Sequence, residues 1–566
     1  MAFADVLEQV GSTGRFQVLH VTLLCIPILM MASHNLLQNF VAAVPPHYCR
    51  APTNFSLSHL DPQVALLLTV PRDSDGQLSK CQRYSNPQWH LLARNSTSEE
   101  TGGAAQSTAD PFTADLEGCK EGWEYNMTSM PSTIISEWDL VCDLRSLKQM
   151  GQSIYMGGVL VGALIFGGLS DRFGRRILLL CSHLMMAVGG TCAAFAPNFS
   201  VFCLFRFFCG MALSGLVLNS FSLIVEWIPT RVRTVVGTGT GYCYTTGQLI
   251  LAGVAYFIRD WRWLTLAVSL PFYVSFLYSW WFVESARWLV LNGKTKQAVQ
   301  NLRTVARVNG RRAEGDKINI EMLQESMKKE MSCSQGTYSA LDLLRTPAMR
   351  TITICLSAIW FSTSFAYYGL SMDLQKFGVD IYLIQVIFGA VDIPAKVVVT
   401  VCMSMIGRRP SQCAALIFAG VTVLANLLVP YEKQTVRTCL AVLGKGCLAA
   451  SFNCCYLYSG ELFPTVIRQN GMGWVSMMAR LGAMVAPVML ILGETVTWLP
   501  GVIYGGVPIL AGGFALFLPE TLAMPLPDTI QDAEERSQSL KSSKNSPKKE
   551  EVVLKETSNS LLKEPI

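Results

Sequence analysis

Charged residues are scarce in this chain. They make up 15% of its 566 residues, whereas soluble domains carry about 25%. Hydrophobic residues reach 51%, so the composition excludes an ordinary soluble globular protein and favours a chain that crosses a bilayer many times. We expect the lipid bilayer as a partner and no nucleic acid.

The chain also lacks the motifs that mark common enzymes and nucleotide-driven pumps. It contains no HExxH, no GxSxG, no glycine-rich phosphate loop and no Walker motif. None of its 18 cysteines shows metal-ligand spacing, and we interpret most of them as small buried apolar residues. We therefore expect no enzyme activity, no cofactor and no bound metal.

Long apolar runs are present instead. A membrane-spanning helix needs about twenty apolar residues, because the hydrocarbon core of a bilayer is roughly 30 Å thick. Such runs lie at about 17–41, 149–170, 177–197, 199–222, 235–257, 263–283, 351–372, 381–405, 411–430, 437–459, 470–492 and 497–518. The first run is too long for a cleaved signal peptide. The sequence therefore predicts an all-α integral membrane protein with twelve transmembrane helices.

Basic residues predict the orientation of these helices. Residues 284–348 contain eleven Lys and Arg, and the turns "DRFGRR" and "GRR" lie on the same side. Because basic residues gather on the cytoplasmic side, we expect both termini in the cytoplasm and residues 42–148 outside. That outer loop contains three N-x-S/T sequons, and we expect glycans at Asn54, Asn95 and Asn126.

The outer loop and the C-terminal tail are the two long segments outside the bilayer. Four cysteines lie in the loop, and in an oxidising compartment they predict two disulfides, with three connectivities open. These are Cys49, Cys81, Cys119 and Cys142. After Pro519 the chain becomes rich in charge and serine, so we expect 519–566 to be a disordered cytoplasmic tail.

The chain repeats itself once. "DRFGRR" is answered by "MIGRRP", "EWIPTRVR" by "ELFPTVIR" and "ESARW" by "ETL", at offsets of 233, 235 and 236 residues. This constancy predicts two parallel six-helix bundles, with a binding site between them near the midplane of the bilayer. The expected divisions are an N-terminal segment 1–16, a first bundle 17–283, a linking segment 284–348 and a second bundle 349–518.

Several motifs resemble those of a known family. "GGLSDRFGRR" and "RFFCG" are similar to motifs of the major facilitator superfamily. "MASHNLLQNF", "STIISEWDLVC", "ESARW", "YYGLSMDLQ", "FGAVDIPAK", "LGKGCLAASFN" and "ELFPTVIRQ" resemble the organic anion transporter branch of solute carrier family 22, in particular its renal anion and dicarboxylate exchangers. The superfamily pattern usually has proline at the place of Val283. The resemblance implies the major facilitator fold and the plasma membrane.

Four cations lie at the centres of predicted helices, where each costs about 2.5–3.5 kcal/mol on insertion scales. They are Arg206, Lys396, Lys445 and Arg480, against one central acid, Asp392. Four minus one leaves a formal +3 inside the bilayer, and such a cavity favours anions.

Each charge has a competing interpretation. Asp392 and Lys396, four residues apart on one helix, could neutralise each other. Arg206 belongs to a motif shared by carriers of unrelated substrates, which favours packing or gating, and Lys445 could bind backbone carbonyls. Arg480 has no acid within four residues and is the best candidate for a substrate carboxylate, because a guanidinium can donate two hydrogen bonds to one.

Aromatic residues on 351–372 complete the predicted site. An aromatic stripe is more often core than site, but the resemblance favours a substrate wall, which suits flat amphiphilic anions. The substrate-binding set expected from the residues and the resemblance together is Lys396, Arg480, Tyr367, Tyr368, Trp360, Phe452, Tyr244, Phe221, Asn35 and Asn39.

A second set of charges lies where the bundles meet the cytoplasm. Pairs among them could hold the inner gate closed and open it again, although charges that only set the topology are the alternative. The expected gating and coupling set is Asp171, Arg172, Arg175, Arg206, Glu226, Glu284, Arg287, Asp392, Lys445, Glu461 and Arg468.

The sequence thus predicts a carrier of amphiphilic organic anions that works by alternating access. The resemblance implies exchange for an intracellular dicarboxylate such as 2-oxoglutarate, and chloride is a further candidate ligand. The alternatives are a facilitative carrier, a zwitterion or cation carrier of the same fold, and an adhesion or receptor role for the large loop.

Overall fold

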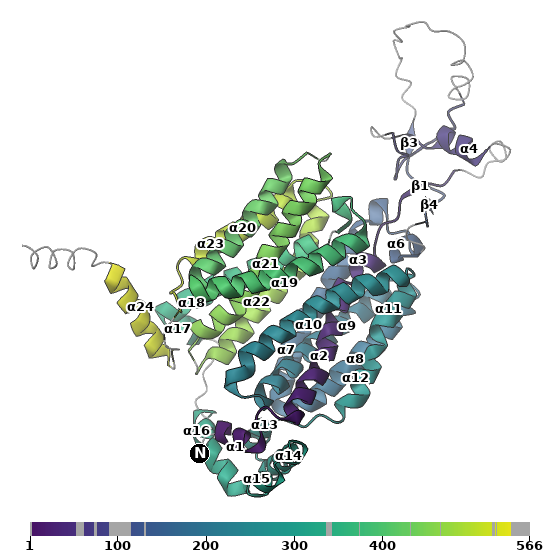
Figure 1. Ribbon diagram of the computed structural model, residues 1–566. Helices are drawn as coiled ribbons and strands as arrows, with labels where there is room; N and C mark the ends of the chain where they lie inside the picture. The colour runs from purple at the N-terminus through teal and green to yellow at the C-terminus, as the bar shows by residue number, and fades with distance from the viewer. Residues whose placement is uncertain are drawn as a thin grey trace, which may run out of the picture.

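The computed structural model is a helical bundle with a small lobe at one end (Figure 1). It describes residues 3–544 apart from 52–60, 73–75, 90–114, 129–131 and 335–341. Single positions outside the description are 373, 431, 465, 523, 525, 526 and 528. The lobe is the loop between the first two spans, and it projects past the helix ends on the side away from the N-terminus.

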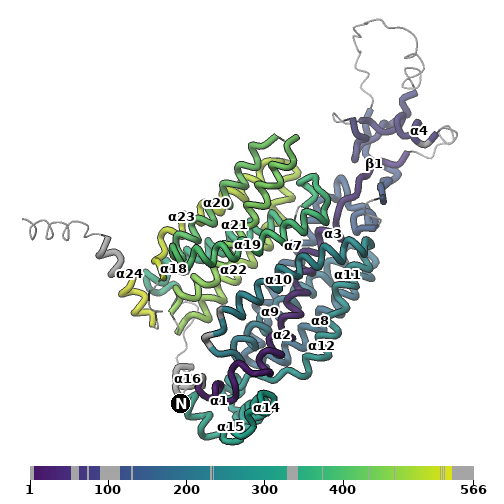
Figure 2. The backbone as a smooth tube through the Cα atoms, viewed as in Figure 1, coloured from purple at the N-terminus to yellow at the C-terminus, as the bar shows by residue number. Residues whose placement is uncertain are grey.

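A helix is present at each of the twelve predicted ranges. The first half contains α2 (Arg15–Leu36) with α3 (Gln38–Val41), α7 (Ser146–Phe173), α8 (Arg175–Ala194), α9 (Phe199–Trp227), α10 (Thr230–Phe257), and α11 (Trp261–Ser269) followed by α12 (Pro271–Ser279). The second contains α18 (Pro347–Ser371), α19 (Ile381–Met405), α20 (Arg408–Leu428), α21 (Gln434–Leu462), α22 (Arg468–Leu492) and α23 (Leu499–Ala515). The two halves lie side by side, as the colours of Figure 2 show.

The twelve helical spans differ in hydropathy. Among the described residues, eight helical segments are long and apolar enough to cross a membrane by length and composition alone. The four remaining predicted spans are α10, the α11–α12 pair that breaks at Pro271, α18 and the shorter α23. Because α10 and α18 are long but rich in Thr, Ser and Tyr, we infer that their polar faces are turned to protein rather than lipid.

Small residues let helices of one half approach closely. A Cβ atom placed on Gly158 of α7 would lie 2.2 Å from the Phe207 carbonyl oxygen of α9, and one on Gly210 of α9 would lie 2.2 Å from the Tyr155 carbonyl oxygen. Such contacts are typical of membrane helices, where packing replaces the hydrophobic effect as the source of association.

The sequence repeat has a structural counterpart, which we call the carboxylate hubs. Glu284 accepts from the backbone N–H groups of Arg175 and Arg176 at 3.2 and 3.0 Å, where α8 begins. Glu520 accepts from those of Arg408 and Arg409 at 2.9 and 3.0 Å, where α20 begins. Each carboxylate therefore satisfies amide groups that a helix N-terminus leaves without partners.

In each half, an arginine at the start of the capped helix also forms an ion pair with a second glutamate. In the first half Arg175 pairs with Glu226 at 3.5 Å, and in the second Arg408 pairs with Glu461 at 3.0 Å. Burial by itself would raise the pKa of Glu520, but four backbone N–H donors hold the pKa of this carboxyl below its ordinary value. The hubs fix the ends of the helices within each half.

The linking segment folds into helices. It contains α13 (Ala286–Leu291), α14 (Thr295–Val308), α15 (Arg312–Asp316), α16 (Ile320–Ser334) and α17 (Asp342–Arg345), and α1 (Phe3–Val10) packs against it. Of these helices, α13 to α16 lie below the first half (Figure 1), and α17 packs against α18 of the second half. Asn309 joins the pieces, since its Nδ2 donates to the carbonyls of Val10 and Gly11 and its Oδ1 accepts from the Phe16 N–H at 2.9 Å.

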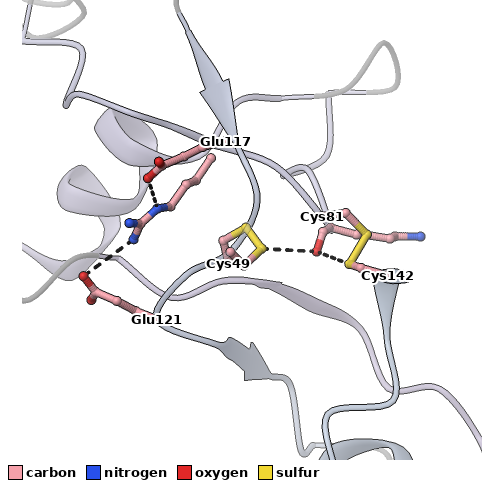
Figure 3. Close-up of a disulfide and its surroundings, with 8 residues drawn as sticks. Cys49, Cys81, Glu117, Glu121 and Cys142 are labelled. Carbon is pink, nitrogen blue, oxygen red and sulfur yellow. Dashed lines mark hydrogen bonds and ion pairs between the residues drawn. A yellow bond between two sulfur atoms is a disulfide. The ribbon is translucent and has the colours of Figure 1, made fainter. Parts of the chain in front are cut away.

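The projecting loop contains two short antiparallel strand pairs and two disulfides. β1 (His47–Cys49) pairs with β4 (Trp123–Tyr125), and β2 (Arg83–Tyr84) pairs with β3 (Leu116–Glu117). Of the three open connectivities, the structure has Cys49–Cys119 and Cys81–Cys142. Arg83 pairs with Glu117 at 2.9 Å and Glu121 at 3.7 Å beside them (Figure 3).

The remaining elements of this loop are helical. They are α4 (Pro62–Thr69), α6 (Ile134–Glu137) and the 3-10 turn η1 (Cys142–Leu144). The sequon at Asn126 is exposed, whereas Asn54 and Asn95 lie outside the described residues.

The prediction that the whole tail is disordered was wrong for its first part. Residues Ile530–Lys544 form α24, whose start carries reciprocal caps between Thr529 and Asp532. Ala533 is buried, and Glu534 Oε1 accepts from the Ala348 N–H at 2.8 Å in the first turn of α18. Composition favoured disorder, but the cap and the tertiary contact order this segment. Residues 545–566 lie outside the described residues.

The Glu520 hub gives a test of this architecture. Gly407, which precedes α20, has φ of +114°, and a Cβ atom there would lie 2.6 Å from a Glu520 carboxylate oxygen. We expect Gly407→Ala to destabilise the protein by about 1–3 kcal/mol and to lower its apparent melting temperature in detergent. Gly506→Ala on α23, where no atom lies within 4 Å, is the control. Equal melting of the two variants would contradict the role of the hub.

Candidate functional site

A buried ion pair lies at the centre of the second half. Lys445 Nζ of α21 is 2.8 Å from Asp392 Oδ1 of α19, and the two side chains are 1% and 2% exposed. Tyr367 donates to Asp392 Oδ2 at 3.0 Å, and Lys445 also donates to the Phe388 carbonyl. The carboxylate and the ammonium thus have partners, as buried charges require.

This pairing decides between two interpretations of the sequence. Asp392 could have neutralised Lys396 on its own helix, but it pairs with Lys445 from α21 instead. Lys396 Nζ turns to the other half and donates to the Gly241 carbonyl and to Thr245 Oγ1 of α10, both at 2.8 Å. Helical spacing permitted a pair between Asp392 and Lys396 on α19, but the packing of α21 against α19 gave Asp392 a different partner, Lys445.

Arg480 has a hydroxyl group, and not a carboxylate, as its hydrogen-bond partner. On α22 it is partly buried, and its Nη1 donates to Ser476 Oγ, one turn away, at 3.0 Å. Within the part of the chain that the structure describes, no acidic side chain forms an ion pair with it. Tyr368 and Tyr456 lie near its guanidinium. A partly buried guanidinium of this kind can bind an anion.

Arg206 has the surroundings of a packing residue. It is 2% exposed, donates to the His34 carbonyl at 3.2 Å and lies 4.1 Å above the centre of the Tyr155 ring. These partners belong to α2 and α7 of its own half, so Arg206 joins three helices of one bundle. Tyr155 in turn donates to Asn35 Oδ1 at 3.0 Å.

The predicted aromatic residues gather on α18 and α21. The ring centres of Tyr367 and Phe452 are 5.3 Å apart, those of Tyr367 and Tyr368 5.5 Å, and those of Trp360 and Phe452 6.3 Å. Sequence reasoning missed Tyr456, which is 4.6 Å from Trp360 and 57% exposed. Its position one helical turn after Phe452 was the signal that could have found it.

The first half contributes the other predicted residues in different ways. Asn35 donates to the Tyr244 hydroxyl at 3.3 Å, which joins α2 to α10. Asn39 donates to the Ser371 carbonyl at 2.8 Å and so links the halves at the loop end. Phe221 is 51% exposed on α9 and takes part in none of the ring contacts found among the described residues. The structure therefore does not bring Phe221 to the aromatic group.

The predicted gating charges form pairs within each half. Arg175 contacts Asp171 and Glu226, both at 3.5 Å, while Arg172 is exposed. In the second half Glu461 pairs with Arg408, and Arg468 Nε donates to the Phe463 carbonyl at 3.2 Å. Sequence reasoning left out Arg408, Arg409 and Glu520, although the internal repeat marked their positions.

The site offers no metal-binding arrangement. Among the described residues, no group of three or more His, Cys, Asp or Glu side chains could hold an ion. Two of the predicted substrate-binding residues, Lys396 and Arg480, are cations whose hydrogen bonds go to neutral groups.

Comparisons with known proteins give likenesses over the whole chain. Residues 110–531 match the family described as "Sugar (and other) transporter". The chain is 72% identical to "Solute carrier family 22 member 6" of Danio rerio, covering 100% of both, and 70% identical to the protein of that name from Pseudopleuronectes americanus, again covering 100% of both.

Solved structures show the same fold. The inward-open conformation of the xylose transporter XylE from E. coli matches with a TM-score of 0.57 and 19% identity, over 69% of this chain and 89% of that one. The major facilitator fold with two six-helix halves is thus confirmed.

The buried ion pair gives a prediction of its own. Asp392→Asn leaves the Lys445 ammonium buried without a counter-charge, and we expect a loss of stability of about 3–5 kcal/mol. The double variant Asp392→Asn with Lys445→Met should regain most of that loss, measured by thermal unfolding in detergent. Asp171→Asn, at a side chain that is 81% exposed, is the control and should change little. A double variant as unstable as the single one would refute the pairing.

Proposed function

The chain belongs to solute carrier family 22, within the sugar (and other) transporter family, and we propose that it exchanges amphiphilic organic anions for an intracellular dicarboxylate. Membership makes it a multi-pass membrane transporter and not an enzyme, and its high identity to member 6 of that family supports organic anions as substrates. The exchange, the orientation and the residues that bind substrate are our proposals.

The observation that carries the proposal is the imbalance of charge at the centre. Asp392, the single central acid, forms its ion pair with Lys445. Lys396 and Arg480 therefore remain as cations that a substrate could bind. A carboxylate bound to Arg480 would form charge-assisted hydrogen bonds in a site of low dielectric constant. An organic cation would meet two positive charges there, which argues against a cation carrier.

The aromatic rings account for the preferred class of anion. The buried rings of Trp360 and Tyr367 each pack edge-to-face against Phe452, and Tyr456 adds a partly exposed ring. Such walls bind flat apolar bodies, while a few polar groups fix their orientation. We propose that the aromatic part of the substrate packs here with its carboxylate toward Arg480.

Contacts between the halves support alternating access. At the loop end, Asn39 donates to the Ser371 carbonyl, Gln375 accepts from the Val44 N–H at 2.9 Å, and Arg145 pairs with Glu494 at 2.9 Å. At the other end the hub pairs lie within each half. This arrangement fits a carrier closed at the loop end, in which each half moves as one body.

We place the protein in the plasma membrane with both termini in the cytoplasm. The disulfides of the loop need an oxidising compartment, and the sequon at Asn126 is exposed. Both observations support our proposal that the loop lies outside and that α1, α13–α17 and α24 lie inside, and the positive-inside rule for 284–348 supports it as well.

Energy coupling favours exchange over facilitated diffusion. A cell is negative inside, so an entering anion loses roughly 2.3 kcal/mol per charge per 100 mV. The sequence has no Walker motif, so concentrative uptake would draw on a second gradient, and we propose that a counter-substrate supplies it. A dicarboxylate such as 2-oxoglutarate has two carboxylates for the two cations. Chloride would occupy one of them.

We expect Arg480→Asp to lower uptake of a labelled aromatic monocarboxylate on the order of a hundredfold, since it removes a charge-assisted hydrogen bond worth about 1.5–3 kcal/mol and adds repulsion. Surface labelling should show normal delivery of the variant. Arg345→Asp is the matched control, because that side chain is 81% exposed. Normal uptake by Arg480→Asp would disprove the assignment.

Exchange itself is tested with the purified full-length protein in vesicles. At a clamped potential, we expect uptake of the aromatic anion to be faster into vesicles that contain 2-oxoglutarate than into vesicles without it. The reason is that a carrier with bound 2-oxoglutarate can turn its site back to the outside, whereas a carrier without a ligand cannot. Loading with succinamide, an uncharged analogue, is the control. Equal rates in loaded and empty vesicles would favour facilitated diffusion.

A further inference from the structure

Helices α10 and α19, one from each half, face each other through polar contacts that we call the α10–α19 seam. The seam consists of Gly241, Thr245 and Gln248 of α10 with Asp392 and Lys396 of α19. Their spacing of four and three residues on α10, and of four on α19, places each set on one face of its helix. The helices also pack closely here, since a Cβ atom on Gly389 would lie 2.7 Å from Leu249.

Two of the three α10 residues of the seam are fully buried. Thr245 and Gln248 are both 0% exposed. Gln248 Nε2 donates to the Tyr367 hydroxyl at 3.1 Å and contacts Asp392 Oδ2 at 3.5 Å. The first half is thereby joined to the Lys445–Asp392 ion pair of the second half.

Lys396 has the central position in the seam. An ammonium has three donors and no acceptor, and two of these donors are used by α10, at Gly241 O and Thr245 Oγ1. Without an anion, the charge of Lys396 therefore holds the two halves together. A carboxylate is a stronger acceptor for an ammonium than a neutral hydroxyl, so an anion that binds Lys396 weakens its hold on α10.

We propose that Thr245 is a positioning residue, whose hydroxyl binds Lys396 in the empty carrier and so holds α19 against α10. Only a bound anion then frees the α10–α19 seam, which must open before the binding site can return to the other side of the membrane. This inference rests on the proposed function, because it explains why the empty carrier does not return. It adds a cause to exchange, because one cation of the empty site, Lys396, is bound to the opposite half.

The neighbouring residue provides a matched control. Thr246 lies next to Thr245 on α10, but its side chain is exposed and its hydroxyl donates to the Tyr242 carbonyl of its own helix at 2.9 Å. Thr246→Val therefore makes the same chemical change without touching Lys396. Thr245→Ser keeps the acceptor and should preserve the dependence on exchange.

The test compares uptake of a labelled aromatic carboxylate into vesicles with and without internal 2-oxoglutarate, at a clamped potential, for the full-length protein. Removing one charge-assisted hydrogen bond should speed return of the empty carrier on the order of tenfold. We expect Thr245→Val to raise uptake into empty vesicles and to bring the loaded-to-empty ratio toward one. Wild type, Thr246→Val and Thr245→Ser should keep a high ratio.

Two other outcomes would overturn a proposal, and they can be told apart. A high wild-type ratio that Thr245→Val leaves unchanged, even if both rates fall together, would overturn the seam inference and leave exchange standing. A wild-type ratio of one would overturn exchange and the inference with it. Thr245→Ala, which introduces a smaller side chain, is measured in parallel and carries the same expectation if the valine variant does not fold.

Discussion

A charge inside a membrane protein needs a partner, and the positions of several helices depend on one buried ion pair that meets this need. Lys445 and Asp392, joined at 2.8 Å and almost completely buried, connect α21 to α19. Tyr367 and Gln248 complete the surroundings of the carboxylate. Breaking such a pair would leave a bare charge in a medium of low dielectric constant. The positions of α10, α18, α19 and α21 around it are therefore coupled.

The other two central cations have neutral partners instead of a carboxylate, and this difference distinguishes the proposed site. Because Lys445 uses the single central acid, Lys396 and Arg480 are left with neutral partners: a carbonyl and a hydroxyl for the first, a serine hydroxyl for the second. Neutral acceptors satisfy hydrogen bonds without cancelling charge. We propose that the centre thus stays positive and attracts anions, and that nearby aromatic rings favour anions with an apolar body.

The ends of the helices show how each half keeps its shape. Glu284 and Glu520 cap the start of α8 and of α20 with equivalent bonds, 236 residues apart. Their arginines pair inside the same half. A half built this way can rotate as a unit, whereas the contacts that cross between halves, at Asn39 and along the α10–α19 seam, have to break and re-form.

The sequence by itself determined the number of spans, the repeat and the list of buried charges, because each of these depends on residue type and on distance along the chain. It also determined the aromatic stripe of α18, since helical periodicity places Trp360 and Tyr367 on one face. Only the tertiary structure decided that Asp392 pairs with Lys445, that Lys396 reaches Thr245, that Phe221 stays apart and that α24 is ordered against α18. Periodicity fixes the face of one helix, but which residues meet depends on how neighbouring helices are rotated and shifted against each other. That choice is made by the packing of the whole bundle.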